Sequence, residues 1–511
     1  MRVLRLLLLF VLGAGVSAYG SQPDLPHEYG PAYLVYAGPY SSSPASAFGH
    51  LFLVLQQRED DPLPLWDVVT FVAQTNDAGP LRFMITGITG GFLGRYTEAK
   101  FHNQVRDYEV LEDRDLWLLQ LDLTQDQRRA LNQHISELSS SFYPYFFFTK
   151  NCAYYLQEVL SHVMNAVPAP SGPTSPIGVM ELISNIGAVK ACYFRPSISR
   201  RLQTELRTVS SMSLEKIHGQ DWRDLASDHK WIAGLTPSER GFVQQYVYYK
   251  SLNATAPPDS GSMRGMELMR VLNASDTEHV GAVAGKVNLG EARSFPDFHS
   301  YTKFSMSTET GGDGNVRIGV GIRPAIHDLE DPWVGFRRIN TLQMLSVDLS
   351  RSTQDWDVRL DRLVIYSQRA LTPVSFVVDD PSWCLELQAE RKGVFGSNKL
   401  NWVTRGGYGR TWEPMSDSYF YALLSGAVIW AADESIAVAP GVIAGAAFVG
   451  SRTWRAGIES TFEASLFSGS QRVSAADLWI RRDLGKSLGA TAFISYGDED
   501  PRYGVRFSMY P

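Results

Sequence analysis

The C-terminal part of the chain alternates regularly between apolar and polar residues. One run begins with Trp454, Ala456 and Ile458, which alternate with Arg455 and Gly457. Similar runs recur over residues 286–511, about a dozen in all, at the spacing of a β-array. Together with glycine-rich turns and an aromatic terminal run, they favour an outer-membrane-type β-barrel of about 12 strands. A soluble β-sandwich or barrel shows the same alternation and is the alternative.

Residues 30–200 show a different pattern, in which short apolar runs are interspersed with segments of helical periodicity. Thr124 followed by Gln127 predicts a capping box and a helix to about Ser139, and a second helix begins near Asn151. The segment from Gly87 to Gly94 is predicted to be loop-rich. We therefore expect an α+β domain whose strands lie at Ala32–Tyr36, Leu51–Leu55, Trp66–Ala73 and Trp117–Leu123.

Residues 201–285 connect these two parts and are predicted to be mostly helical. Helices are expected at Trp222–Ala226 and Ser238–Leu252. A stretch rich in Pro, Ser, Gly and Ala follows at Asn253–Met263 and is predicted to be a linker.

The N-terminus has the features of a secretory signal peptide over residues 1–18. Arg2 and Arg5 precede an apolar run, and Val16-Ser17-Ala18 has the small-residue pattern of a cleavage site. The apolar run is short for a membrane span, so an uncleaved anchor is the less favoured alternative. We expect a protein that is exported to the periplasm and outer membrane of a Gram-negative-type envelope.

Composition and charge narrow the function classes. The chain is 44% hydrophobic and 12% aromatic, which is ample for folded cores, and its formal net charge is −7 with no basic run. Nucleic acid is therefore not predicted as a partner. The three cysteines are Cys152, Cys192 and Cys384. An odd number in an exported protein leaves at least one thiol unpaired, either buried or reactive.

Cys152 has the best sequence context for a reactive thiol. It follows the aromatic run Phe146-Phe147-Phe148 and stands at the start of a predicted helix. The positive end of a helix dipole and the nearby Lys150 would favour the thiolate. A Cys at such a position can act as a nucleophile, although a lone Cys is more often a small core residue.

His50 is the candidate base for that thiol. It ends the string Ser43-Pro44-Ala45-Ser46-Ala47-Phe48-Gly49 and begins a predicted strand, an unusual place for an imidazole. Small residues before it, Ser46 among them, leave room for a substrate. A structural histidine bonded to backbone is the alternative. Papain-like sites place a Cys at a helix N-terminus opposite a His on the adjoining sheet, and the order His then Cys suits a circularly permuted version.

Several strings together resemble the Lnb N-terminal periplasmic domain family. They are Ser43–His50, Ala73–Asn76 with Gly87–Gly94, Tyr108–Leu123, Tyr145–Leu156 and Arg195–Ser197 with Arg200. The string from Gly321 to Leu329 resembles a motif at the start of the family's C-terminal β-domain. The combination is specific, although each string alone is not.

The resemblance implies a permuted papain/NlpC-like fold and lipoprotein N-acylation as the activity. Cys152 would accept a fatty acyl chain from a phospholipid as a thioester, and His50 would act as the general base. The acceptor would be the N-terminal amine of a lipoprotein. Fold alone does not select that acceptor. Where the family has an Asn-Tyr pair, this chain has Thr70-Phe71. The residue that orients His50 is therefore predicted to be Thr70, with Gln74 as the alternative.

Three functions remain open from the sequence. A thiol acyltransferase predicts an apolar groove beside Cys152, where Asn151, Phe147 and Phe148 would contact the substrate. A cysteine hydrolase acting on peptidoglycan would use the same pair in an open polar cleft. A non-enzymatic outer-membrane scaffold would leave Cys152 structural, and a Cys152–Cys192 disulfide would support it.

Two charged clusters are interpreted as structural. Glu112, Arg114 and Asp115 are expected to form an ion-pair network rather than a head-group site. Arg323, His327 and Asp328 are a poor metal-ligand set and are expected to stabilise a turn. The sequence contains no phosphate-binding loop or zinc-helix motif, so neither a metal nor another cofactor is predicted.

Overall fold

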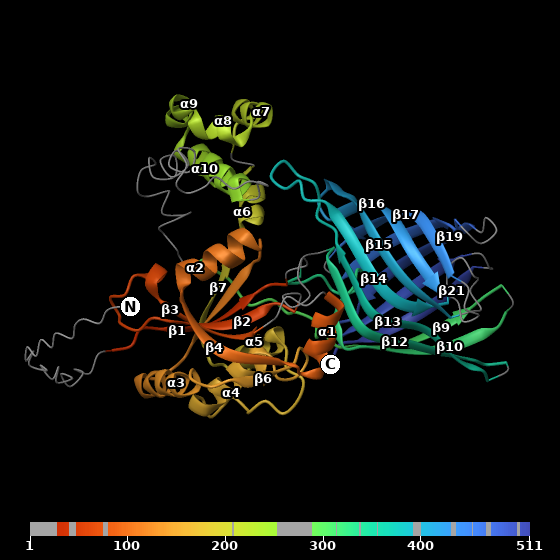
Figure 1. Cartoon of the computed structure of the whole chain (residues 1–511), viewed down its shortest axis with the longest axis horizontal. Helices are drawn as coiled ribbons and strands as arrows, with labels where there is room; N and C mark the ends of the chain where they lie inside the picture. The colour runs from red at the N-terminus through yellow and green to blue at the C-terminus, as the bar shows by residue number, and fades with distance from the viewer. Residues whose placement is uncertain are drawn as a thin grey trace, which may run out of the picture.

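The computed structural model of the chain describes residues 28–39, 48–74, 80–206, 209–252, 289–312, 314–336, 339–354, 356–391, 400–430, 436–451, 453–466, 472–497 and 501–511. Figure 1 shows an α/β part and a β-barrel side by side, with a helical arm above the α/β part. The predicted signal peptide, Ser46 and the predicted linker at 253–263 lie outside the described residues.

The N-terminal domain is built on an antiparallel sheet in the order β6-β4-β3-β2-β1-β5-β7-β8. Apolar residues fill both faces of its central strands because helices or turns cover each face. One core contains Leu34, Leu51 and helix α4, and the other contains Val35, Phe52 and Phe101. The strands are β1 (Ala32–Ala37), β2 (His50–Leu55), β3 (Asp67–Gln74), β4 (Phe92–Lys100), β5 (Leu116–Leu121), β6 (Tyr143–Tyr145), β7 (Val189–Arg195) and β8 (Glu291–Ala292).

The helices of this domain agree with most of the sequence predictions. Thr124 and Gln127 form the predicted capping box at the start of α3, and Asn151 caps α4. The helical elements are η1 (Leu63–Leu65), α1 (Pro80–Thr89), α2 (Phe101–Val105), η2 (Arg106–Leu111), α3 (Gln125–Leu138), α4 (Cys152–Val163) and α5 (Pro176–Asn185).

The predicted loop at Gly87–Gly94 is wrong, because this segment contains the end of α1 and the start of β4. Its glycines serve close packing. A Cβ at Gly87 would lie 2.2 Å from the Phe147 ring, and one at Gly90 would lie 2.1 Å from the Phe146 ring. Gly90 also has a φ of 82° just after α1 ends, a conformation that favours glycine. Glycine content alone therefore misled the prediction.

The helical arm comprises α6 (Ile198–Glu205), α7 (Ser211–Gly219), α8 (Trp222–Ser227), α9 (His229–Gly234) and α10 (Pro237–Leu252). The two helices predicted in this region are confirmed as α8 and α10. The arm has its own apolar core, which also includes Val377 and Val378 from a barrel loop. The Phe376 ring of that loop lies 5.3 Å from the Tyr246 ring of α10. The arm is therefore packed against the barrel.

The C-terminal domain is a closed antiparallel barrel of 12 strands, as predicted. Neighbouring strands pair in sequence from β12 to β21, β21 pairs with β9, and β10 pairs with both β9 and β12, which closes the ring. The short β11 (Ala325–His327) continues the path of β10 along β12. The strands are β9 (Lys303–Thr310), β10 (Val316–Arg323), β12 (Thr341–Ser352), β13 (Val358–Ala370), β14 (Ser382–Glu390), β15 (Asn401–Met415), β16 (Ser418–Trp430), β17 (Ile436–Val449), β18 (Trp454–Ala464), β19 (Arg472–Asp483), β20 (Leu488–Tyr496) and β21 (Arg502–Met509).

The alternation of the barrel strands places apolar side chains outside. In β18, Trp454 and Ile458 are exposed whereas Arg455 is buried. On β15, Trp402 and Trp412 are both exposed and stand ten residues apart, about 33 Å along a strand. With the usual tilt this corresponds to the roughly 25 Å apolar band of an outer-membrane barrel between aromatic girdles. A soluble barrel would not expose this surface. None of the described helices is both long and apolar enough to cross a membrane.

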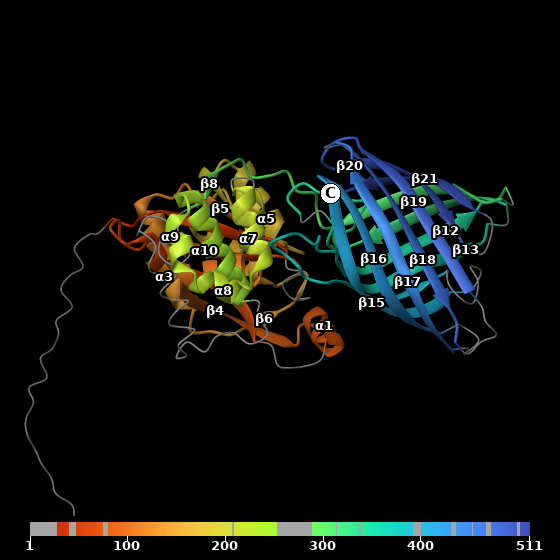
Figure 2. The same cartoon turned by 90° about the horizontal axis from the view of Figure 1, so that it is seen from above.

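The N-terminal domain packs on one end of the barrel, as Figure 2 shows from above. One continuous apolar core contains Tyr36 and Leu51 of the sheet as well as Phe298, Phe336 and Tyr366 of the barrel domain. The Tyr36 and Phe298 rings meet edge-on at 5.9 Å between centroids. The start of β2 therefore lies close to the mouth of the barrel.

A candidate thiol site at the start of helix α4

Helix α4 holds Cys152 at its first position through a fully engaged cap. The Asn151 Oδ1 accepts the backbone N–H groups of Ala153 and Tyr154, at 3.0 and 3.1 Å. Its Nδ2 donates to the carbonyls of Phe147 at 3.0 Å and Thr174 at 2.7 Å. The amide has no capacity left, so Asn151 acts as a structural cap rather than as the predicted substrate contact.

The Cys152 sulfur lies against the first peptide of β2. Helix α4 packs on β2 and β3, and the backbone N–H groups of Leu51 and Ala153 act to lower the pKa of the Cys152 thiol. Cys152 is a free thiol and is 4% exposed. Leu51 directly follows His50, so both predicted residues lie near the start of β2. The Cys152–Cys192 disulfide considered for a scaffold protein is not formed, because Cys192 is also free.

Burial decides the protonation state of this thiol. It raises the pKa of Cys152, and the N–H groups of Leu51 and Ala153 offset this only in part. The predicted preference for the thiolate is therefore wrong for the resting protein. The N–H groups at the helix start do lower the pKa of the thiol, but desolvation raises it by more. The Lys150 side chain is exposed to solvent, which weakens its effect on the thiol. Cys152 rests as a neutral thiol that needs a base.

His50 is held by Thr70 on the neighbouring strand. Strands β2 and β3 are antiparallel neighbours, and the His50 Nε2 lies 2.5 Å from the Thr70 Oγ1. Burial, followed by the charge of Arg114, lowers the pKa of His50 to about 3, so the ring is neutral at pH 7. When Nε2–H donates to Thr70, the lone pair is on Nδ1, the arrangement that a general base requires.

Gln74 does not reach this histidine. It stands at the exposed end of β3, and none of the hydrogen bonds among the described residues joins it to His50. Of the two candidates for the third residue, the structure brings only Thr70 to His50.

Cys152 lies in an apolar core cluster, against which Phe48 and Phe148 pack. Phe147 is buried and its N–H donates to the Gly87 carbonyl at 2.9 Å, while the Phe148 ring meets Phe48 at 5.5 Å. Tyr145 is close enough to Cys152 to interact with it electrostatically, and the Tyr108 ring lies 6.0 Å from His50. The sequence assigned no role to these two tyrosines, although each begins one of the strings that resemble the family. The surroundings of the thiol are thus largely apolar.

The first charged cluster is structural, as predicted. Arg114 is buried and donates to the carbonyls of Gly38 at 2.6 Å and Ala37 at 2.9 Å, and it pairs with Glu112 at 2.6 Å. The Asp115 carboxylate accepts the backbone N–H of Ser197. These contacts tie the end of β1 to β5 and α6. Because Arg114 is buried and makes these contacts, it is not available to bind a head group.

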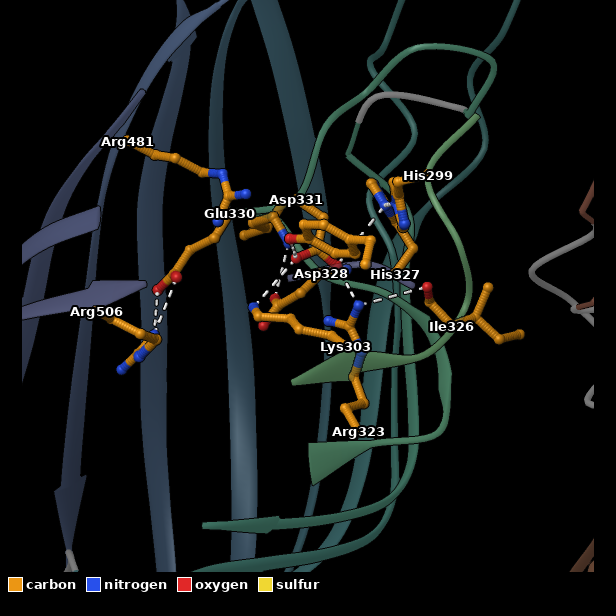
Figure 3. Close-up of polar contacts among 12 residues, drawn as sticks. His299, Lys303, Arg323, Ile326, His327, Asp328, Glu330, Asp331, Arg481 and Arg506 are labelled. Atoms are coloured by element: carbon orange, nitrogen blue, oxygen red, sulfur yellow. Dashed lines mark hydrogen bonds and ion pairs between the residues drawn. The ribbon is translucent and has the colours of Figure 1, made fainter. Parts of the chain in front are cut away.

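A second cluster lies inside the barrel mouth, where Figure 3 shows charged side chains converging on Asp331. His299, His327 and Asp331 place possible ligand atoms within 4.8 Å of one another. The Asp331 carboxylate already accepts Arg323 at 2.5 Å, Tyr510 at 2.7 Å and Lys303 at 3.1 Å. Two adjacent cations oppose a third positive charge. The cluster has the contacts of the predicted turn-stabilising network.

The neutral state of His50 has a consequence for stability. An unfolded histidine has a pKa near 6.5, so unfolding takes up a proton between pH 3 and 6.5. Folding stability is therefore expected to rise with pH across this window, by up to about 1.4 kcal/mol per pH unit from His50 alone. Urea unfolding of the wild type and His50→Gln at several pH values measures this slope. Equal slopes for the two proteins would show that His50 is not buried in its neutral form.

Comparison with known proteins supports the division into two domains. Residues 29–184 match the family model described as the Lnb N-terminal periplasmic domain, and residues 297–507 match a domain of unknown function, DUF7840. The resemblance found in the sequence is confirmed for the N-terminal domain. No match is found among curated proteins.

Several solved outer-membrane proteins resemble about two fifths of the chain. The KdgM porin in complex with disordered oligogalacturonate is 10% identical, with a TM-score of 0.26. The match covers 40% of this chain and 98% of the porin chain. The NanC porin is 8% identical, with a TM-score of 0.27 and coverages of 41% and 99%. A loop-deletion mutant of OmpT, an outer membrane protein of Vibrio cholerae, is 9% identical, with a TM-score of 0.22 and coverages of 42% and 99%.

Proposed function

We propose that this cell-envelope protein, an Lnb N-terminal periplasmic domain joined to an outer-membrane barrel, transfers fatty acyl chains through a Cys152 thioester. The proposal rests on three features near the start of β2: a thiol at a helix start, backbone N–H groups that lower its pKa, and a neutral His50 held by Thr70. The barrel keeps this site at a membrane surface, where a phospholipid is the natural acyl donor.

The first half-reaction forms the thioester. His50 takes the proton from the Cys152 thiol as the sulfur attacks the ester carbonyl of the lipid. The backbone N–H of Cys152, at the first position of α4, is suited to stabilise the oxyanion. The intermediate then expels the lipid alkoxide, which takes the proton back from the imidazolium. The products are an acyl thioester on Cys152 and a lysophospholipid.

The second half-reaction passes the acyl chain to an amine. The N-terminal amine of a lipoprotein attacks the thioester carbonyl while His50 accepts a proton from the nitrogen. The carbon–sulfur bond breaks, and the thiolate recovers a proton from the imidazolium. An amide is formed and the free thiol is restored, so that neither a metal nor a redox step is needed to balance the reaction.

The surroundings of Cys152 favour acyl transfer over hydrolysis. Cys152 is almost fully buried in an apolar core cluster with Tyr36 and Leu51, and Phe148 packs against this cluster. An apolar site retains a lipid chain and limits access of water to the thioester. A peptidoglycan hydrolase needs an open polar cleft for a hydrophilic peptide, and the described contacts of Cys152 do not resemble one.

The test supplies both halves of the reaction to the purified protein. Detergent-solubilised protein is incubated with phospholipid whose acyl chains carry an isotope label, and the Cys152 peptide is analysed by mass spectrometry. A labelled adduct that hydroxylamine removes is expected, followed by a labelled amide when a diacylglyceryl-cysteine peptide is added. If no adduct forms and the protein instead releases peptides from cell wall, the activity is that of a hydrolase.

Thr70→Val is expected to slow thioester formation about 10- to 100-fold with little change in the KM for phospholipid. The variant removes the hydroxyl that accepts from His50, and a hydrogen bond to a charged imidazolium contributes about 1.5–3 kcal/mol. Initial rates of adduct formation measure the effect. Thr97→Val is the matched control, because Thr97 lies opposite Thr70 on β4 and its hydroxyl makes only a long 3.5 Å contact with the Thr70 carbonyl. Equal rates of adduct formation for the two variants would show that Thr70 has no role in the reaction.

A further inference from the structure

One side chain of the barrel domain reaches the start of strand β2. The Tyr301 hydroxyl donates to the Phe48 carbonyl at 2.5 Å, two residues before His50. The Tyr301 and Phe48 rings lie 6.1 Å apart, and Phe48 in turn meets Phe148 of the segment before Cys152. Tyr301 is also close enough to Cys152 to interact with it electrostatically. A residue of the second domain therefore borders both halves of the thiol site.

The segment that carries Tyr301 is fastened on both sides by the buried cluster of Figure 3. On one side, His299 Nδ1–H donates to the Ser300 carbonyl at 2.7 Å, so its Nε2 accepts from His327 Nδ1 at 2.9 Å. On the other side, Lys303 pairs with Asp331 at 3.1 Å. His299, Lys303 and Asp331 are all buried. This cluster fixes the backbone of Tyr301 relative to the barrel wall.

The hydrogen bond from Tyr301 restrains the backbone that leads to His50 and Leu51, beside the Cys152 sulfur. Phe48 is followed by Gly49, which has a φ of 81° and the freedom that glycine brings. Without an anchor at the Phe48 carbonyl, the turn into β2 would carry this freedom to His50 and to the Leu51 N–H, which lowers the pKa of Cys152. A hydrogen bond from a rigid partner removes that freedom.

We propose that Tyr301 of the barrel domain is a positioning residue of the thiol site, which holds the His50–Leu51 turn through the Phe48 carbonyl. The N-terminal domain supplies the reacting groups, and the barrel completes their alignment. The site is therefore fully ordered only when the barrel is folded. This inference rests on the proposed function for its biological meaning, but its geometric content concerns only the reactivity of the Cys152 sulfur.

The test measures the reactivity of Cys152 in the full-length protein. Wild type and Tyr301→Phe, both in detergent, are treated with iodoacetamide between pH 6 and 10, and alkylation of the Cys152 peptide is followed by mass spectrometry. Tyr301→Phe keeps the ring on Phe48 but removes the hydroxyl. We expect about tenfold slower alkylation at pH 8 and a midpoint displaced to higher pH, because the Leu51 N–H no longer stabilises the thiolate as well. Thioester formation is expected to slow by a similar factor.

Tyr36→Phe is the matched control. The Tyr36 hydroxyl lies 3.4 Å from the Tyr301 hydroxyl and thus one link further from Phe48. Its removal is expected to change alkylation less than about twofold. The heat-dependent electrophoretic shift of a folded barrel identifies the fraction to be scored. If Tyr301→Phe misfolds, 3-fluorotyrosine at position 301 replaces it, and its more acidic hydroxyl should shift the midpoint to lower pH.

The outcomes separate this inference from the proposed function. Identical rates and pH profiles for wild type and Tyr301→Phe would overturn the positioning role, whatever lipid chemistry is found. A displaced profile without any acyl adduct in the wild type would support the positioning role while rejecting acyl transfer. Equal effects of Tyr301→Phe and Tyr36→Phe would indicate general loosening of the interface and would also overturn it.

Discussion

Cys152→Ser is expected to lower the rate of acyl-adduct formation at least about 10³-fold, to below detection in the mass-spectrometric assay. A serine hydroxyl is far less acidic than a thiol, and His50 in its buried, neutral state is a weak base. Among the described residues, Cys152 is the one cysteine at the start of α4. The variant should still fold, because Cys152 makes no disulfide and serine is nearly isosteric.

Two other substitutions control for this result. Cys192 on β7 and Cys384 in the barrel are free thiols whose removal leaves the His50–Thr70 pair untouched. Cys192→Ser and Cys384→Ser are therefore expected to retain the Cys152 adduct at the wild-type rate. A labelled chain on Cys192, or an adduct that persists in Cys152→Ser, would show that the reactive thiol lies elsewhere.

The barrel could be predicted because its signal is local and repeated. Alternation such as that of Trp454 and Ile458 with Arg455 and Gly457 needs only the period of a strand. The pair of strands that closes the ring could not be predicted in the same way. It is formed by β10 and β12, and the sequence of neither strand alone indicates this pairing. The exposed apolar face at Trp402 and Trp412 likewise becomes evident only once inside and outside are distinguished.

The site was predictable in its residues but not in its electrostatics. Cys152 and His50 stand out because a helix start and a strand start are unusual places for a thiol and an imidazole. The neutral state of the thiol depends on its burial in a core whose residues are distant in the chain. Tyr301 is separated from Phe48 by 253 residues and a domain boundary, so no local pattern could indicate the contact.

Substitutions in the barrel interior are expected to have effects as large as those at the thiol site, but on the free energy of unfolding rather than on activity. Arg405 on β15 is buried and donates to Glu386 and Glu463 at 2.7 Å each, with Glu390 at 3.7 Å. Arg405→Leu removes the guanidinium that Glu463 contacts and leaves its buried carboxylate without that charge. We expect a loss of about 3–5 kcal/mol in the free energy of unfolding, measured by urea denaturation in detergent micelles.

Arg410→Leu on the same strand provides the comparison, because it removes the same side chain from a solvent-exposed ion pair with Asp379. Exposed pairs contribute about 0–1 kcal/mol, so this variant should unfold almost as the wild type does. The difference between the two variants measures what burial adds to the Arg405 network. A loss of less than about 1 kcal/mol for Arg405→Leu would mean that water in the barrel screens these charges. In that case the interior would be a solvated lumen. The cluster around Asp331 would then hold Tyr301 without support from strong ion pairs inside the barrel.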